Sequence, residues 1–163
     1  MIAAFLALAL AASPRVDLRL VTYPQWQKEL LAMRGRIVVV DLWATWCVPC
    51  VARFPKMIAM SKRWRPKGVT FVSLSLDDRA EPGSYDHVLK FLKEHDARIP
   101  NFMMNEVLPD AFDKLNLNSV PAVIIYDAGG RERARLTGDD PNHQFTERDV
   151  EAALDRLATP SAR

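Results

Sequence analysis

Hydrophobic residues follow two alternating spacings along the chain. Continuous apolar runs rich in β-branched residues, such as RIVVVDLW (36–43) and GVTFVSLSLDD (68–78), are typical of strands buried on both faces. Between these runs, apolar residues three or four positions apart predict helices. The pattern predicts helices over 23–35, 51–64, 84–96, 108–116 and 146–158, strands over 36–43, 68–78 and 98–105, and a hairpin over 121–138.

Local signals mark several helix ends. Gly35 is placed to end the first helix, and Ser84 is a candidate N-cap for the third. Thr146 and Asp149 have the spacing of a capping box before the last helix. Pro55 lies inside the second helix, where we expect a kink.

The order of the elements predicts the fold class. Strands that alternate with helices favour a parallel-centred sheet, and the late hairpin adds antiparallel strands at one edge. We therefore expect an α/β protein with a central mixed β-sheet flanked by helices on both faces. At 163 residues the chain has about the length of one domain, which we assign to 14–163 with a core over about 20–158.

The first residues, MIAAFLALALAAS (1–13), are uncharged and apolar. A membrane-spanning helix needs about 20 such residues, whereas the apolar region of a secretory signal takes about 7–15 and ends in a small-x-small site, which Ala9-Leu10-Ala11 fits. No Lys or Arg precedes the run. We predict that 1–13 is a signal peptide or an N-terminal anchor and that the protein is exported; a short buried N-terminal helix is the alternative.

Both cysteines lie in WATWCVPC (43–50), between a predicted buried strand and a helix. At a helix N-terminus, free N–H groups and the helix dipole favour a thiolate and lower the pKa of a thiol. Cys50 follows Cys47 by three residues, so both sulfurs lie on one helix face. Pro49 falls in the first turn, where its missing N–H costs nothing.

Three kinds of site use such a pair. A structural staple is a poor explanation, because a disulfide stabilises least when the loop it closes is short. A zinc site normally needs four ligands, and we expect the three histidines, His87, His95 and His143, to be solvated. The pattern favours a dithiol–disulfide couple at a strand–helix junction.

Two separated segments carry a family resemblance. VVVDLWATWCVPC (38–50) resembles the active-site segment of the thioredoxin superfamily, and the FP that follows makes it most similar to the exported TlpA/ResA-like thiol–disulfide oxidoreductases. NSVPAVIIYDAGG (118–130) resembles the cis-proline strand of that superfamily. The resemblance implies a thioredoxin fold, with a cis Val120–Pro121 bond opposite the cysteines.

The resemblance also implies roles for individual residues. Cys47 corresponds to the nucleophile, the more exposed cysteine, and Cys50 to the cysteine that resolves the mixed disulfide. Trp46 and Pro121 are expected to cover the site on two sides, while the backbone of Val120 pairs with an incoming peptide. Trp43 is expected to pack beneath the site.

Asp41 interrupts an apolar strand, so we expect a buried carboxyl with a raised pKa. It matches the buried aspartate that accepts the proton of the resolving cysteine in thioredoxins. Ser73 stands where thioredoxins place a lysine, so Asp41 is expected to lack its counter-charge. Arg53 stands where ResA-like proteins often carry a glutamate; we expect it to reach solvent, the alternative being that it favours a thiolate.

Taken together, the sequence predicts an enzyme, a thiol–disulfide oxidoreductase that acts on proteins, most readily as a reductase outside the cytoplasm. We expect a monomer with no cofactor beyond the Cys47–Cys50 pair and no metal. Expected partners are protein thiols and disulfides and an upstream electron donor, for which a membrane-bound reductase is a candidate. With 22 basic and 20 acidic residues, nothing indicates nucleic acid. The alternative is a redox-inert or metal-carrying module.

Overall fold

The computed structural model describes residues 15–140, 142 and 144–158. The segment 1–13, interpreted as a signal or anchor, lies outside them, as does His143. Within the described residues the strands are β1 (Arg19–Val21), β2 (Ile37–Trp43), β3 (Val69–Ser75), β4 (Asn101–Met104), β5 (Ala122–Tyr126) and β6 (Glu132–Thr137). The helices are α1 (Tyr23–Ala32), α2 (Val48–Trp64), α3 (Ser84–Glu94), α4 (Leu108–Leu115) and α5 (Glu147–Ala158), with a short 3-10 helix over Arg65–Lys67.

The strands form one mixed sheet in the order β1-β4-β3-β2-β5-β6. β1, β4, β3 and β2 run parallel to one another, whereas β5 is antiparallel to β2 and β6 is antiparallel to β5. This confirms the predicted parallel-centred sheet with an antiparallel hairpin at one edge. β2, the strand that leads to the cysteines, lies in the middle of the sheet and is paired along both sides.

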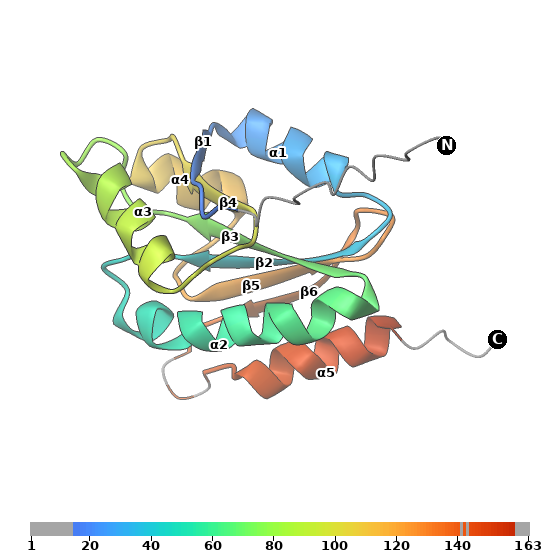
Figure 1. The fold of residues 1–163 in the computed structure, drawn as a ribbon. Helices are drawn as coiled ribbons and strands as arrows, with labels where there is room; N and C mark the ends of the chain where they lie inside the picture. Colours follow the sequence, from blue (N-terminus) through green and yellow to red (C-terminus); the bar gives the residue numbers. More distant parts are fainter. Residues whose placement is uncertain (1–14, 141, 143, 159–163) are drawn as a thin grey trace, which may run out of the picture.

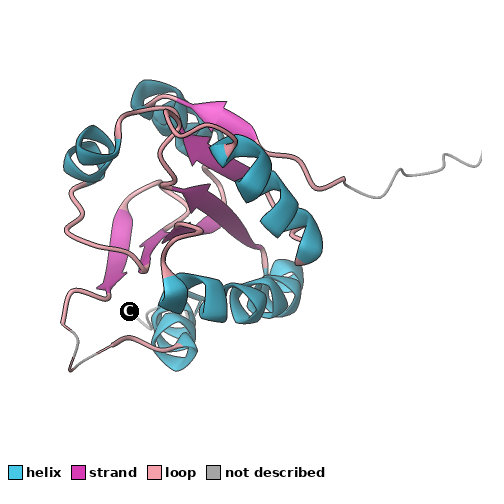
Figure 2. Ribbon diagram, turned by 90° about the vertical axis from the view of Figure 1, so that its left-hand side faces the viewer, coloured by secondary structure: helices cyan, strands magenta, loops and turns pink. Residues whose placement is uncertain are grey.

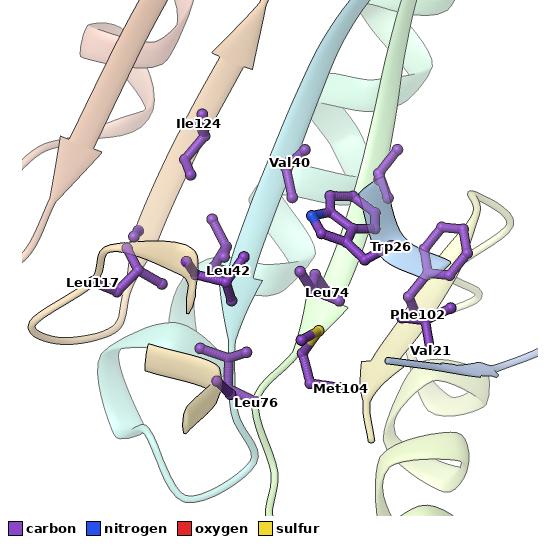
Figure 3. Packing of buried hydrophobic residues seen from close by; sticks show 14 of the residues in the cluster. Val21, Trp26, Val40, Leu42, Leu74, Leu76, Phe102, Met104, Leu117 and Ile124 are labelled. Atoms are coloured by element: carbon purple, nitrogen blue, oxygen red, sulfur yellow. The ribbon is translucent and has the colours of Figure 1, made fainter. Parts of the chain in front are cut away.

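Side chains alternate across β2, so the strand contributes to both layers of the core. Val38, Val40 and Leu42 point to the face covered by α1 and α4. There they join a cluster that includes Trp26 and Phe102 (Figure 3). Burial on both faces explains why the strand consists of a continuous apolar run rather than an alternating one.

The opposite face of the sheet carries α2, α3 and α5. Trp43 packs with residues of α2 and α3, and Val39 with residues of α2 and α5. Figure 1 shows α1 above the sheet and α2 and α5 below it, and Figure 2 shows helices on both sides of the strands. The expected layers, helices on both faces of a mixed sheet, are therefore confirmed.

Several element ends differ from the prediction. The predicted second helix begins earlier, at Val48, directly after Cys47, and runs through Pro55. α1 ends at Ala32, and Gly35 instead occupies a turn with a φ of 93°. Gly83, with a φ of 77°, is the N-cap of α3, so Ser84 is not.

Other details bear on the predicted caps and strands. The backbone N–H of Thr146 donates to the Asp149 carboxylate over 2.7 Å, as a capping box requires. β1 was not predicted, because three residues are too few to show a period. None of the helices in the part of the chain that the structure describes is long and apolar enough to cross a membrane.

Candidate redox site

Cys47 and Cys50 form a disulfide, with their Cα atoms 5.2 Å apart. Cys47 is the N-cap of α2, and its sulfur accepts a hydrogen bond from the backbone N–H of Cys50 at 3.3 Å. The free N–H groups of a helix start therefore point toward this sulfur, as the sequence predicted. Pro49 lies in the first turn. Free N–H groups at such a position favour the thiolate form of a reduced cysteine.

The two cysteine residues differ little in exposure. Cys47 is 4% exposed and Cys50 is 1% exposed, so the order is as expected, but both cysteines are buried. The exposed groups around them are the side chains of Trp46 and Val48, which are 52% and 78% exposed. An approaching polypeptide therefore meets an apolar surface on either side of Cys47.

The Val120–Pro121 peptide bond is cis. Val120 packs against the cluster that contains both cysteines, and Pro121 is buried just before β5. Leu42 pairs with Ala122 in the sheet, so Pro121 lies level with the end of β2, where the cysteine loop begins. The structure thus brings the two separated sequence motifs together.

The loop before Cys47 is fixed by a residue that the sequence did not single out. The Asp77 carboxylate, at the end of β3, accepts hydrogen bonds from the Thr45 backbone N–H at 3.0 Å and from the Thr45 hydroxyl. It also accepts one from the Ser75 hydroxyl at 2.6 Å. Asp77 is buried, and these contacts anchor the loop two residues before Cys47 to the segment that follows β3.

An aromatic cluster forms the floor of the site. Trp43 is fully buried, as expected, and its indole N–H donates to the Ser73 hydroxyl at 2.7 Å. Its ring lies 4.7 Å from that of Phe54 and 4.8 Å from that of Phe91. The expectation that His95 is solvated is wrong, because its half-buried ring packs 4.4 Å from Phe91. His87 is exposed, as expected.

Asp41 is buried, as predicted, but it does not lack a counter-charge. A guanidinium nitrogen of Arg53 donates to its carboxylate at 2.7 Å, and Arg53 is only 7% exposed. The expectation that Arg53 reaches solvent is therefore wrong. The physical reason is its place on α2, one turn after the buried Cys50 and on the same face.

Burial and the ion pair act on Asp41 in opposite directions. Burial raises the pKa of the carboxyl, because the charged form loses its hydration, and this effect is the larger. The charge of Arg53 and its hydrogen bond lower the pKa, but only in part. The expected rise of the Asp41 pKa is thus confirmed, and the ion pair makes this rise smaller than that of an unpaired buried carboxyl.

The described residues do not form a metal site of the usual kind. Among the described residues, no three of the types His, Cys, Asp and Glu gather in a way that could hold a metal ion. The cysteine pair could thus supply two thiolate ligands at most, whereas structural zinc normally takes four ligands.

Two proteins that are similar in sequence to this chain are named as thiol–disulfide oxidoreductases. It is 25% identical over 121 residues to "Thiol-disulfide oxidoreductase ResA" of Bacillus cereus, covering 72% of this chain and 64% of the relative. It is 36% identical over 72 residues to the ResA of Oceanobacillus iheyensis, covering 44% of this chain and 35% of the relative. The matched part thus spans less than two thirds of the length of these relatives.

Solved structures of similar fold and one family profile also match this chain. A thiol:disulfide interchange protein of the thioredoxin family from Chlorobium tepidum superposes with a TM-score of 0.61 at 21% identity, over 79% of this chain and 84% of the other. A secreted Mycobacterium tuberculosis disulfide oxidoreductase gives 0.60 at 19% identity, over 78% and 86%. These likenesses confirm the thioredoxin fold. The profile of the Redoxin family matches residues 11–154, and the chain therefore belongs to the Redoxin family.

Proposed function

We propose that this protein is a thiol–disulfide oxidoreductase that exchanges its Cys47–Cys50 pair with protein substrates. The observation that carries the proposal is the disulfide at the start of α2, where the Cys50 N–H already points at the Cys47 sulfur. Such a donor stabilises a Cys47 thiolate more than a neutral disulfide sulfur, as a pair that cycles between the two forms requires. The names of the ResA relatives support the same reaction.

The exchange begins with the reduced protein. The Cys47 thiolate attacks one sulfur of a substrate disulfide, the substrate S–S bond breaks, and its other sulfur leaves as a thiolate. A mixed disulfide between Cys47 and the substrate remains. The cis-proline loop at Val120 and the exposed Trp46 flank this position, and we expect the backbone before Pro121 to pair with the substrate as an extra strand.

Resolution then regenerates the disulfide. The Cys50 thiol gives its proton to Asp41, and its thiolate attacks the Cys47 sulfur. The bond between Cys47 and the substrate breaks, and the substrate leaves as a second thiolate. Two electrons have passed from the protein to the substrate. A dithiol donor must return them before the next cycle.

We further propose that the protein works outside the cytoplasm as a reductase. The apolar segment 1–13 supports export, and the solved Mycobacterium tuberculosis relative is described as secreted. The donor would then be a dithiol protein that faces the same compartment, and a membrane-bound reductase fits that requirement. No cofactor other than the cysteine pair takes part in the proposed cycle.

The reduction potential of the cysteine pair tests the proposal. The protein is equilibrated in glutathione buffers of graded redox poise, free thiols are alkylated, and the two forms are counted by mass spectrometry. We expect a two-electron transition between about −270 and −120 mV, the range of thioredoxin-type couples, toward the low end if the protein is a reductase. A disulfide that stays oxidised at every poise, or a reduced pair that does not react with a model protein disulfide, would overturn the proposal.

A further inference from the structure

Arg53 is a buried cation whose hydrogen-bonding capacity is mostly unused. One guanidinium nitrogen reaches Asp41, while Nε and the other terminal nitrogen are buried without a partner among the described residues. A buried group left in this state costs free energy. An apolar side chain would avoid that cost, so the arrangement calls for an explanation beyond packing.

A second residue holds the guanidinium in place. The ring of Phe145, which precedes α5, lies 4.4 Å from the carbon at the centre of the Arg53 guanidinium. Phe145 itself packs against the core between α2 and α5. The face of the aromatic ring attracts the cation, and the ring covers one flat side of the guanidinium against water. Arg53 is thus held between a carboxylate and an aromatic ring.

The strands on either side of Asp41 place uncharged residues opposite it. On β3 its pairing partner is Ser73, whose hydroxyl accepts from Trp43; on β5 the partner is Val123. Among the described residues, Arg53 on α2 is the charged group that acts on the pKa of Asp41. Asp41 points to the same sheet face as Trp43, beneath the helix that begins with the cysteines. Three helical residues, a rise of about 4.5 Å along α2, separate Cys50 from Arg53.

We propose that Arg53 is a positioning residue for the resolving step: it keeps the Asp41 carboxylate ionised and oriented so that it can take the proton of Cys50, and Phe145 keeps Arg53 there. This inference rests on the proposed function. The counter-charge of Asp41 is then Arg53 on α2, and not a residue of β3. Phe145, in the segment before α5, has the specific role of holding Arg53.

The pH profile of the resolving step separates this role from a purely structural one. The mixed disulfide of Cys47 with glutathione is prepared, and release of glutathione is followed by stopped flow from pH 5 to pH 9. Arg53→Met keeps the length of the side chain without its charge, and Arg53→Lys keeps the charge. Phe145→Leu removes the ring but keeps an apolar residue. Arg63→Met is the matched control, because Arg63 also lies on α2 but forms an exposed ion pair with Glu151 of α5.

The expected results are graded. Arg53→Met moves the rise of the rate to higher pH, by about one unit or more, and slows release about tenfold or more at pH values below the rise. Arg53→Lys restores most of the rate, Phe145→Leu moves the profile in the same direction as Arg53→Met but less, and Arg63→Met leaves it in place. Asp41→Asn removes the rise, and adding Arg53→Met to it has no further effect on the profile.

Two results would overturn the inference. One is an unchanged pH profile in Arg53→Met, even if the variant is less stable or uniformly slower. The other is a further shift of the profile when Arg53→Met is added to Asp41→Asn, because Arg53 would then act without Asp41. If wild-type protein exchanges disulfides normally, either outcome overturns only the role of Arg53 and not the proposed function. Failure of the wild-type protein to form or resolve the mixed disulfide contradicts the proposed function itself.

Discussion

Replacing Asp41 with asparagine should raise the stability of the oxidised protein at neutral pH. The side chain is nearly isosteric, and asparagine can still accept a hydrogen bond from Arg53. What disappears is an ionisable group whose charged form is costly to bury. Because Asp41 is only 4% exposed, burial raises the pKa of its carboxyl above the ordinary 3.8 despite the ion pair.

The sign and size follow from proton linkage. The folded protein holds the Asp41 proton more tightly than the unfolded chain, so the stability due to that proton is full below pH 3.8 and is lost as the pH rises through the raised pKa. Within that window the wild-type protein loses up to about 1.4 kcal/mol per pH unit relative to Asp41→Asn. The two proteins should be about equally stable in acid and diverge toward neutral pH.

Denaturant unfolding of both proteins at each pH from 4 to 8 measures the difference. Asp113→Asn, at an exposed position of α4, controls for the loss of one negative charge. A gap between Asp41→Asn and wild type that grows with pH agrees with the account. A variant that becomes less stable than wild type as the pH rises would show that Arg53 outweighs burial, and a constant gap would show that Asp41 does not titrate in this range.

Two further predictions concern groups away from the ion pair. Asp77→Ala should lower the free energy of unfolding by about 1–3 kcal/mol, because it leaves the Thr45 N–H without its acceptor. Asp77→Asn should lower it less. Equal losses of both variants in urea titrations would refute the role of the carboxylate. Burial raises the pKa of Tyr126 to about 12, with a further contribution from Glu132. An ultraviolet absorbance titration should show an ionisation near pH 12 that Tyr126→Phe removes. The stability due to the neutral phenol should be full below pH 10 and lost as the pH rises through 12. A Tyr126 ionisation near pH 10 would contradict its burial.

The strands and the cysteine site were predictable because each leaves a local pattern. A strand buried on both faces must be apolar at successive positions, as in β2 and β3. The cysteine spacing and the proline between them fix the start of a helix. β1 left no such pattern, since it consists of three residues that gain their partners from β4.

Contacts between distant residues were harder to predict. Thr45 and Asp77 are 32 residues apart, and nothing near either one indicates the other. Arg53, by contrast, left a signal that was misinterpreted. It belongs to a stripe of buried residues on α2 that includes Cys50 and Met57, as Asp41 belongs to a buried strand. A buried acid and a buried base on elements that pack together favour an ion pair over two separate charges.

The order of attack by the two cysteines tests the central claim most directly. Cys50→Ser and Cys47→Ser are each reduced and mixed with a disulfide-containing protein, and covalent complexes are separated on non-reducing gels. The account predicts that Cys50→Ser accumulates a complex through Cys47 that dithiothreitol releases, while Cys47→Ser accumulates little. Equal trapping by both variants, or none by Cys50→Ser, would contradict the claim that Cys47 attacks at the start of α2 and Cys50 resolves.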